Sequence, residues 1–120
     1  MAQSLFEQYG GFAAVSRIVS AFYDRVLESD DLSPYFDGID MRRLIDHQTK
    51  FVATLMGGPS SYTDDQLQRA HSKLGIKSAD FDEAMDLLKE TLEDFDFDET
   101  DISAIVTAFS ARRPFIVTAA

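Results

Sequence analysis

Apolar residues recur every three or four positions along most of this chain, the spacing that places them on one buried face of a helix. Four segments show it and are predicted to be helices: residues 12–28, 41 to about 56, 79–94, and the segment that follows Asp98. Their inward positions are Val15, Ile18, Val19, Phe22, Val26; Leu44, Gln48, Phe51, Val52, Leu55; Phe81, Ala84, Met85, Leu88, Leu92; and Ile102, Ile105, Val106, Phe109. No stretch alternates with period two, so the pattern predicts an all-α fold.

Helix start and stop signals agree with these limits. Ser4 and Glu7 have the spacing of a capping box, which predicts a short helix that ends at the Gly10-Gly11 pair. Asp40 and Asp98 are suited to be N-caps. Three further signals end helices. Gly57-Gly58-Pro59 follows the helix that begins at residue 41, Gly75 follows a short helix around His71, and Pro114 ends or kinks the last helix. Residues 29–40 are predicted to be a loop.

Length and charge restrict the class of protein. The chain has 120 residues, which suits one domain over 1–120, and no cysteine. Its formal net charge of -10 argues against nucleic acid or an anionic membrane as a partner and favours a monomer. The sequence has no secretory signal and no apolar run of the ~18 residues that a membrane span needs, so we expect a cytoplasmic protein.

Two histidines and two other polar side chains fall on or beside apolar stripes. His71 shares a helical face with Leu67, and His47 lies on the flank of the stripe that contains Gln48; Tyr23 lies beside Phe22. Each alone is more often a core or edge residue than a ligand. Together they suit a cofactor cavity with a few convergent polar groups, and two inward histidines on separate helices point to haem before zinc.

Other binding and catalytic motifs lack the residues that they require. The acids from Asp94 to Glu99 resemble a calcium loop, but Glu99 stands where that loop has glycine and Ile105 where it has glutamate. Two histidines without cysteine are too few for a zinc site, and no Ser-His-Asp signature, P-loop or G-x-G-x-x-G occurs.

From about Leu5 to Phe109 the chain resembles the group I truncated haemoglobins, which are short two-over-two helical globins. The matching pieces are Leu5-Phe6-Glu7 before Gly10-Gly11, Phe22 to Leu27, Pro34-Tyr35-Phe36, Asp40-Met41, His47-Gln48 before Phe51, Gly57-Gly58-Pro59, Tyr62, and Ala70 to Ile76. The specificity lies in their order and spacing. The resemblance implies a globin-like, truncated two-over-two helical sandwich around haem b.

The same resemblance implies roles for individual residues. His71 matches the proximal iron ligand, Phe36 the aromatic residue that stacks on the haem, and Tyr23 and Gln48 the distal hydrogen-bonding pair; Leu44 matches a gate position that is polar in some members. The implied pocket or tunnel positions are Phe22, Phe51, Val52, Leu67, Ala84, Met85 and Leu88, with Ile76 and Phe81 as further cofactor contacts and Tyr62 and Arg69 as candidate propionate contacts.

His47 has two implied roles. In some relatives this position binds the iron from the distal side, and in others it touches a propionate or faces water. Some relatives also crosslink the haem to a histidine in the last helix; this chain has no third histidine, so we expect its haem to be non-covalent.

Three functions follow as hypotheses. The first is a haem protein that binds dioxygen or nitric oxide, with nitric-oxide dioxygenation to nitrate as its expected chemistry and an external electron donor to sustain it. The second is a six-coordinate His47/His71 haem protein in electron transfer, redox sensing or stress protection. The third is a helical interaction module without haem, in which the polar set would be costly to bury.

Overall fold

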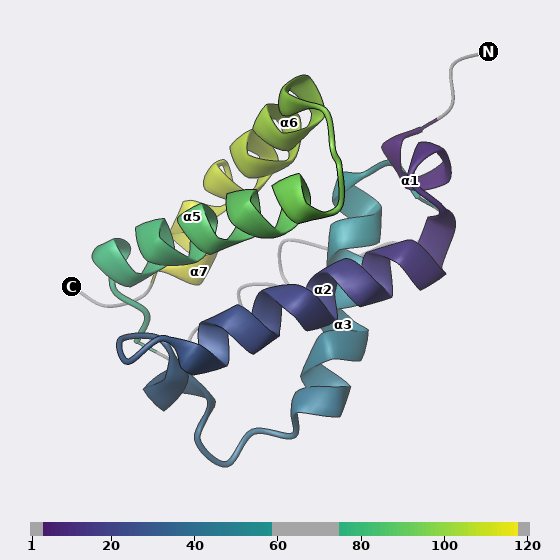
Figure 1. The fold of residues 1–120 in the computed structure, drawn as a ribbon. Helices are drawn as coiled ribbons and strands as arrows, with labels where there is room; N and C mark the ends of the chain where they lie inside the picture. Colours follow the sequence, from purple (N-terminus) through teal and green to yellow (C-terminus); the bar gives the residue numbers. More distant parts are fainter. Residues whose placement is uncertain (1–3, 59–74, 118–120) are drawn as a thin grey trace.

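The chain folds into helices joined by short connections in this computed structural model, which describes residues 4–58 and 75–117 (Figure 1). The described elements are α1 (Leu5–Gln8), α2 (Gly11–Glu28), the 3₁₀ helix η1 (Ser33–Phe36), α3 (Met41–Leu55), α5 (Ser78–Asp94), α6 (Glu99–Ser110) and α7 (Arg113–Ile116). None of the described residues forms a strand, which confirms the predicted all-α class. The expected short helix around His71 lies outside the described residues.

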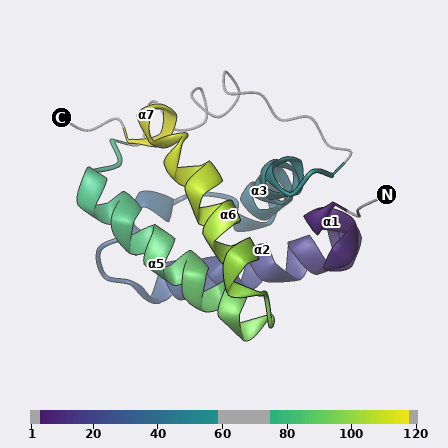
Figure 2. The same ribbon diagram turned by 90° about the horizontal axis from the view of Figure 1, so that it is seen from above.

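Two helix pairs build the fold. α2 packs on α3, α5 packs on α6, and α2 also packs on α5 (Figure 1). Seen from above, α3 and α5 lie on either side of the centre, with α2 beneath and α6 above (Figure 2). Buried residues of all four helices join one hydrophobic cluster, so the apolar stripes that predict the helices are also the faces that meet.

The helix starts follow the predicted caps. The Ser4 hydroxyl accepts a hydrogen bond from the Glu7 N–H, and the Asp40 carboxylate accepts one from the Arg43 N–H. Asp98 is the N-cap residue of α6, although its side chain makes no capping hydrogen bond. At the start of α2, Gly10 has φ +110°, a conformation that glycine adopts without strain.

The structure also corrects three boundaries. α2 and α5 each begin one residue earlier than predicted, and the predicted loop 29–40 contains η1, with Pro34 in its first turn. α6 ends at Ser110, ahead of Pro114, and a further turn, α7, carries Pro114 near its start, where the missing N–H costs no hydrogen bond.

Side-chain contacts between α2, its following loop and α5 hold the two pairs together. Arg25 donates to Thr91 at 2.7 Å and also pairs with Asp94, and the Ser29 hydroxyl donates to Glu83. These contacts hold the last turns of α2, which include Tyr23, against α5. In the described part of the chain, no helix is both long and apolar enough to cross a membrane.

Candidate functional site

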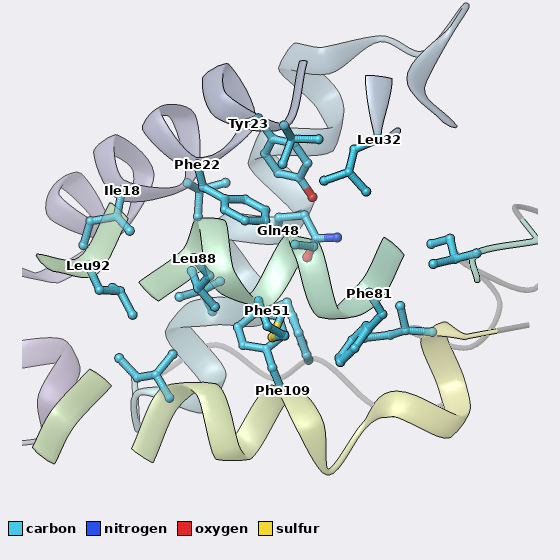
Figure 3. A pocket seen from close by; sticks show the side chains of 18 of the residues that line it. Ile18, Phe22, Tyr23, Leu32, Gln48, Phe51, Phe81, Leu88, Leu92 and Phe109 are labelled. Carbon is cyan, nitrogen blue, oxygen red and sulfur yellow. The ribbon is translucent and has the colours of Figure 1, made fainter. Parts of the chain in front are cut away.

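A cavity lies between α2, α3 and α5, with walls contributed also by η1, α6 and α7 (Figure 3). It contains about 110 Å³ of space for the centres of water-sized molecules, whereas a single water needs only about 10–15 Å³ in that measure. The cavity is therefore larger than a packing defect. Its walls are mostly hydrocarbon and aromatic, so a guest would be apolar over most of its surface.

Two polar groups enter this apolar space from two different helices. Tyr23 comes from α2 and is buried, with 7% of its surface exposed, and Gln48 comes from α3 and is half-buried. Figure 3 shows the Tyr23 hydroxyl and the Gln48 amide both directed into the cavity. A phenol and an amide can each donate a hydrogen bond, so together they form a donor pair for a small guest.

Aromatic neighbours hold Tyr23 in place. Its ring meets Phe22 edge-to-face at 5.1 Å between centroids and Phe36 at 5.6 Å. Across the cavity, Phe51 of α3 meets Phe109 of α6 in the same manner at 5.1 Å. Such pairs are worth about 0.5–1.5 kcal/mol beyond buried area, and they restrict how the rings can tilt.

A second polar pair, Tyr35 and Asp80, lies at the cavity wall between η1 and α5. The Tyr35 hydroxyl donates to the Asp80 carboxylate and accepts from the Lys77 N–H at 3.3 Å. The hydrogen bond to Asp80, and then burial, raise the pKa of Tyr35 above its usual value. This contact ties η1 to α5 and so keeps Phe36 close to Tyr23.

Most of the described residues that the sequence assigns to the site do line this one cavity. They are Phe22, Tyr23, Phe36, Gln48, Phe51, Val52, Ile76, Phe81, Ala84, Met85 and Leu88. Leu44 does not; it is half-buried against the core one turn before Gln48, beyond the edge of the cavity. The predictions for Tyr62, Leu67, Arg69 and His71 lie outside the described residues.

Of the two roles that the sequence leaves open for His47, the structure agrees with a position facing water. Its side chain is exposed and does not line the cavity. Successive helical residues point about 100° apart, and because Gln48 takes the inward position, His47 shares the outer row of Arg43, four residues earlier. One member of the expected inward pair, His47, is therefore exposed, and the other, His71, lies outside the described residues.

Sequence reasoning missed several lining residues. Some, such as Ile18, Leu92 and Ile105, lie on the predicted stripes, but a stripe indicates burial without showing which buried residues border a cavity. Tyr35 is part of a matching piece, whereas Asp80 has no signal in the sequence. The further members are Val19, Val26, Leu32, Met56, Phe109 and Ile116.

The described walls suit a haem. A flat and largely hydrocarbon group needs apolar and aromatic walls on both sides, which α3 and α5 provide through Phe51, Val52, Met85 and Leu88. Tyr23 places in the same space a hydroxyl group, which can donate a hydrogen bond. Within the described residues, no cluster of three or more His, Cys, Asp or Glu could hold a metal ion without such a group.

Comparison with known proteins agrees with this geometry. Residues 4–116 match the family model of bacterial-like globins. The group 1 truncated haemoglobin of Mycolicibacterium paratuberculosis is 32% identical over 115 residues, which cover 96% of this chain and 85% of that protein. The group 1 truncated haemoglobin of Tetrahymena thermophila is 32% identical over 76% of this chain and 75% of its own length.

Solved structures of similar proteins have the same fold. The truncated haemoglobin of Tetrahymena pyriformis in its Fe(III) form superposes with a TM-score of 0.86 at 26% identity, covering 96% of this chain and 98% of that one. The 2/2 haemoglobin of Synechococcus sp. PCC 7002, solved in the cyanomet state with covalently attached haem, superposes with a TM-score of 0.87 at 27% identity, covering 96% of this chain and 98% of that one. Family match, fold and cavity agree: the chain belongs to the bacterial-like globin family, among the group 1 truncated haemoglobins, which bind haem and small gaseous ligands such as dioxygen.

Proposed function

We propose that this chain holds haem b without a covalent bond and converts nitric oxide and dioxygen to nitrate, with electrons from an external donor. The observation that carries the proposal is the convergence of the Tyr23 hydroxyl and the Gln48 amide in an otherwise apolar cavity. A hydroxyl and an amide that converge from two helices in an apolar cavity form a local hydrogen-bonding site for a small polarised guest.

The donor pair would retain dioxygen. When bound, the haem supplies the iron that binds the gas and the electron that the reaction consumes. Dioxygen held there carries partial negative charge, and hydrogen bonds to charged groups are stronger than those between neutral groups. Tyr23 and Gln48 donate to it from α2 and α3, so the gas stays long enough to meet nitric oxide.

The apolar walls would exclude water and admit the second gas. Nitric oxide is small and nearly apolar, so a hydrocarbon path does not hinder it. Ala84 and Val52 are the small lining residues of α5 and α3 and leave the most room for such a path. A dry cavity also strengthens the hydrogen bonds of Tyr23 and Gln48, because less water competes for them.

Cofactor retention rests on two groups of residues. Phe36, Phe51, Met85 and Leu88 would contact the haem faces from the described walls, and His71, by the resemblance, would ligate the iron from the proximal side. The sequence has no third histidine that could form a crosslink. Because His47 is exposed, the distal side of the haem would be left to the gas.

Each turnover needs one electron, since nitric oxide, dioxygen and one electron together give nitrate. The chain has no flavin or nicotinamide motif, so that electron would come from another protein. A single turnover can nevertheless be tested without the donor, because a chemical reductant can supply the first electron.

The test mixes reduced, oxygen-saturated, haem-loaded protein with one equivalent of nitric oxide and measures nitrate. We expect about one nitrate per haem for the native chain and a lower yield for the double variant Tyr23→Phe/Gln48→Leu, which loses the gas sooner. Tyr9→Phe is the matched control, since Tyr9 donates its hydroxyl to Asp101 away from the cavity. Consumption of nitric oxide without nitrate would contradict the proposal. A reduced spectrum with sharp split bands that dioxygen cannot change would favour the six-coordinate alternative.

A further inference from the structure

The charges of this acidic chain are unevenly distributed between the two sides of the cavity. α3 carries three basic residues, Arg42, Arg43 and Lys50, against one acidic residue, Asp46. α5, on the other side of the cavity, carries seven acidic residues and one basic residue, Lys89. All five named side chains are exposed. α3 is therefore a local basic surface on a chain whose formal net charge is -10.

The position of Arg42 and Arg43 does not serve the helix. Both lie in the first turn of α3, where the helix dipole disfavours positive charge, and that turn has no acidic residue. Neither guanidinium has a hydrogen-bond or ion-pair partner among the described residues, whereas Lys50 pairs with Asp46 at 3.3 Å. Two cations that have no partner in the described part of the chain, at the unfavourable end of a helix, suggest a role in binding another molecule.

An open groove of about 1040 Å³ borders this basic surface between α2 and α3. Its lining includes the apolar residues Phe12, Ala13 and Ile45 and the charged residues Arg42, Asp46 and Lys50. Phe12 is a large apolar side chain that is 43% exposed. An exposed aromatic anchor with charged residues around it is the composition of a protein-docking site.

We propose that this groove and the basic face of α3 dock an acidic electron-transfer protein that returns one electron per turnover to the iron. The proposal rests on the proposed function, which needs such a donor. The partner's carboxylates would meet Arg42, Arg43 and Lys50, and an apolar side chain of the partner would contact Phe12. Redox encounters typically use small, transient interfaces.

α3 is suited to this role because its two faces serve the two partners. Its inner face presents Gln48, Phe51 and Val52 to the cavity, and its outer face carries the basic residues. An α-helix with its side chains is about 10–12 Å thick. A donor docked on α3 would therefore be separated from the haem cavity by a single helix.

The net negative charge of the chain does not prevent such docking at physiological salt. The Debye length there is about 8 Å, so distant charges on α5 are screened while those in contact are not. At low salt the whole-molecule repulsion becomes stronger. The test should therefore compare variants that have the same net charge but carry the altered charge at different positions.

The experiment uses the ferric, haem-loaded protein and photoreduced flavodoxin, an acidic flavoprotein, as the probe. Haem reduction is followed anaerobically by stopped-flow absorption at about 0.15 M salt, where surface charges still act over short distances. Arg42→Glu and Arg43→Glu are compared with Lys89→Glu, which changes the net charge equally on the exposed surface of α5. Reduction by dithionite checks that each variant keeps an accessible haem.

We expect each α3 reversal to slow reduction by flavodoxin roughly three- to tenfold, because electrostatic steering changes association rates by about 10–10³ overall. We expect Lys89→Glu to change it less than twofold. Equal slowing by all three variants, or no slowing by either α3 variant, would overturn the docking surface. The nitrate yield of the dithionite-reduced protein tests the proposed function separately, since no donor protein takes part.

Discussion

Removing the Tyr23 hydroxyl should shorten the time for which dioxygen stays bound. Tyr23→Phe keeps the ring and its edge-to-face contacts with Phe22 and Phe36, so the cavity keeps its shape and only one donor is lost. A hydrogen bond to a charged group is worth about 1.5–3 kcal/mol. Because about 1.4 kcal/mol is a factor of ten, dioxygen should dissociate roughly ten- to 150-fold faster from the variant.

The assay is stopped-flow absorption in which excess carbon monoxide replaces dioxygen on the reduced protein, with Tyr9→Phe as the control for loss of a hydroxyl. Gln48→Leu and the double variant complete a mutant cycle. Since both donors serve the same guest, their effects should be coupled by about 0.5–3 kcal/mol, the usual range for residues that share a partner. An unchanged dissociation rate in Tyr23→Phe would refute the assigned role of this donor, and strictly additive effects would refute a shared guest.

Three further predictions concern the fold around the site. Phe51→Ala should lower the free energy of unfolding by about 3–5 kcal/mol, because it empties a site where the ring is 1% exposed; a loss below about 1 kcal/mol in urea denaturation would contradict this packing. Gly58→Ala should lower the free energy of unfolding by about 1–3 kcal/mol, because a Cβ at this position would approach the Phe6 ring to 2.8 Å. An unchanged melting temperature would contradict this and show that the ring can move aside. The hydrogen bond to Asp80, and then burial, raise the pKa of Tyr35 in the folded protein. The protonated Tyr35 hydroxyl therefore contributes fully to folding stability below about pH 10, and this contribution is lost as the pH rises through the higher folded-state pKa. Tyr35→Phe should therefore be less stable at pH 8 and lose less stability between pH 10 and 12, and parallel denaturation profiles for the two proteins would contradict this.

The sequence predicted the helices well because their signals are local. The three-four spacing in α2, α3 and α5 and the caps at Ser4 and Asp40 depend on residues within one or two turns. η1 escaped prediction for the opposite reason. A 3₁₀ turn is too short to show periodicity, and this one is held by a distant contact, from Tyr35 to Asp80.

The site was predictable where a stripe and the family resemblance agreed, as for Tyr23 and Gln48, which do line one cavity. It was not predictable where the answer depends on rotation about a helix. His47 and Gln48 are neighbours in sequence, but about 100° of rotation separates them, and packing places only Gln48 inward. Asp80 could not be found either, because a carboxylate at the start of an acidic helix looks like any surface charge.

Haem binding is tested most directly by a haem titration of the apoprotein, followed by visible absorption, with the two histidine variants side by side. We expect saturable uptake of one haem per chain, a reduced spectrum with a single broad band, and a site open to carbon monoxide. His71→Ala should lose or alter the iron spectrum, whereas His47→Ala should leave it unchanged, because His47 is exposed. Failure to take up haem, or a spectrum that changes as much in His47→Ala as in His71→Ala, would contradict this expectation.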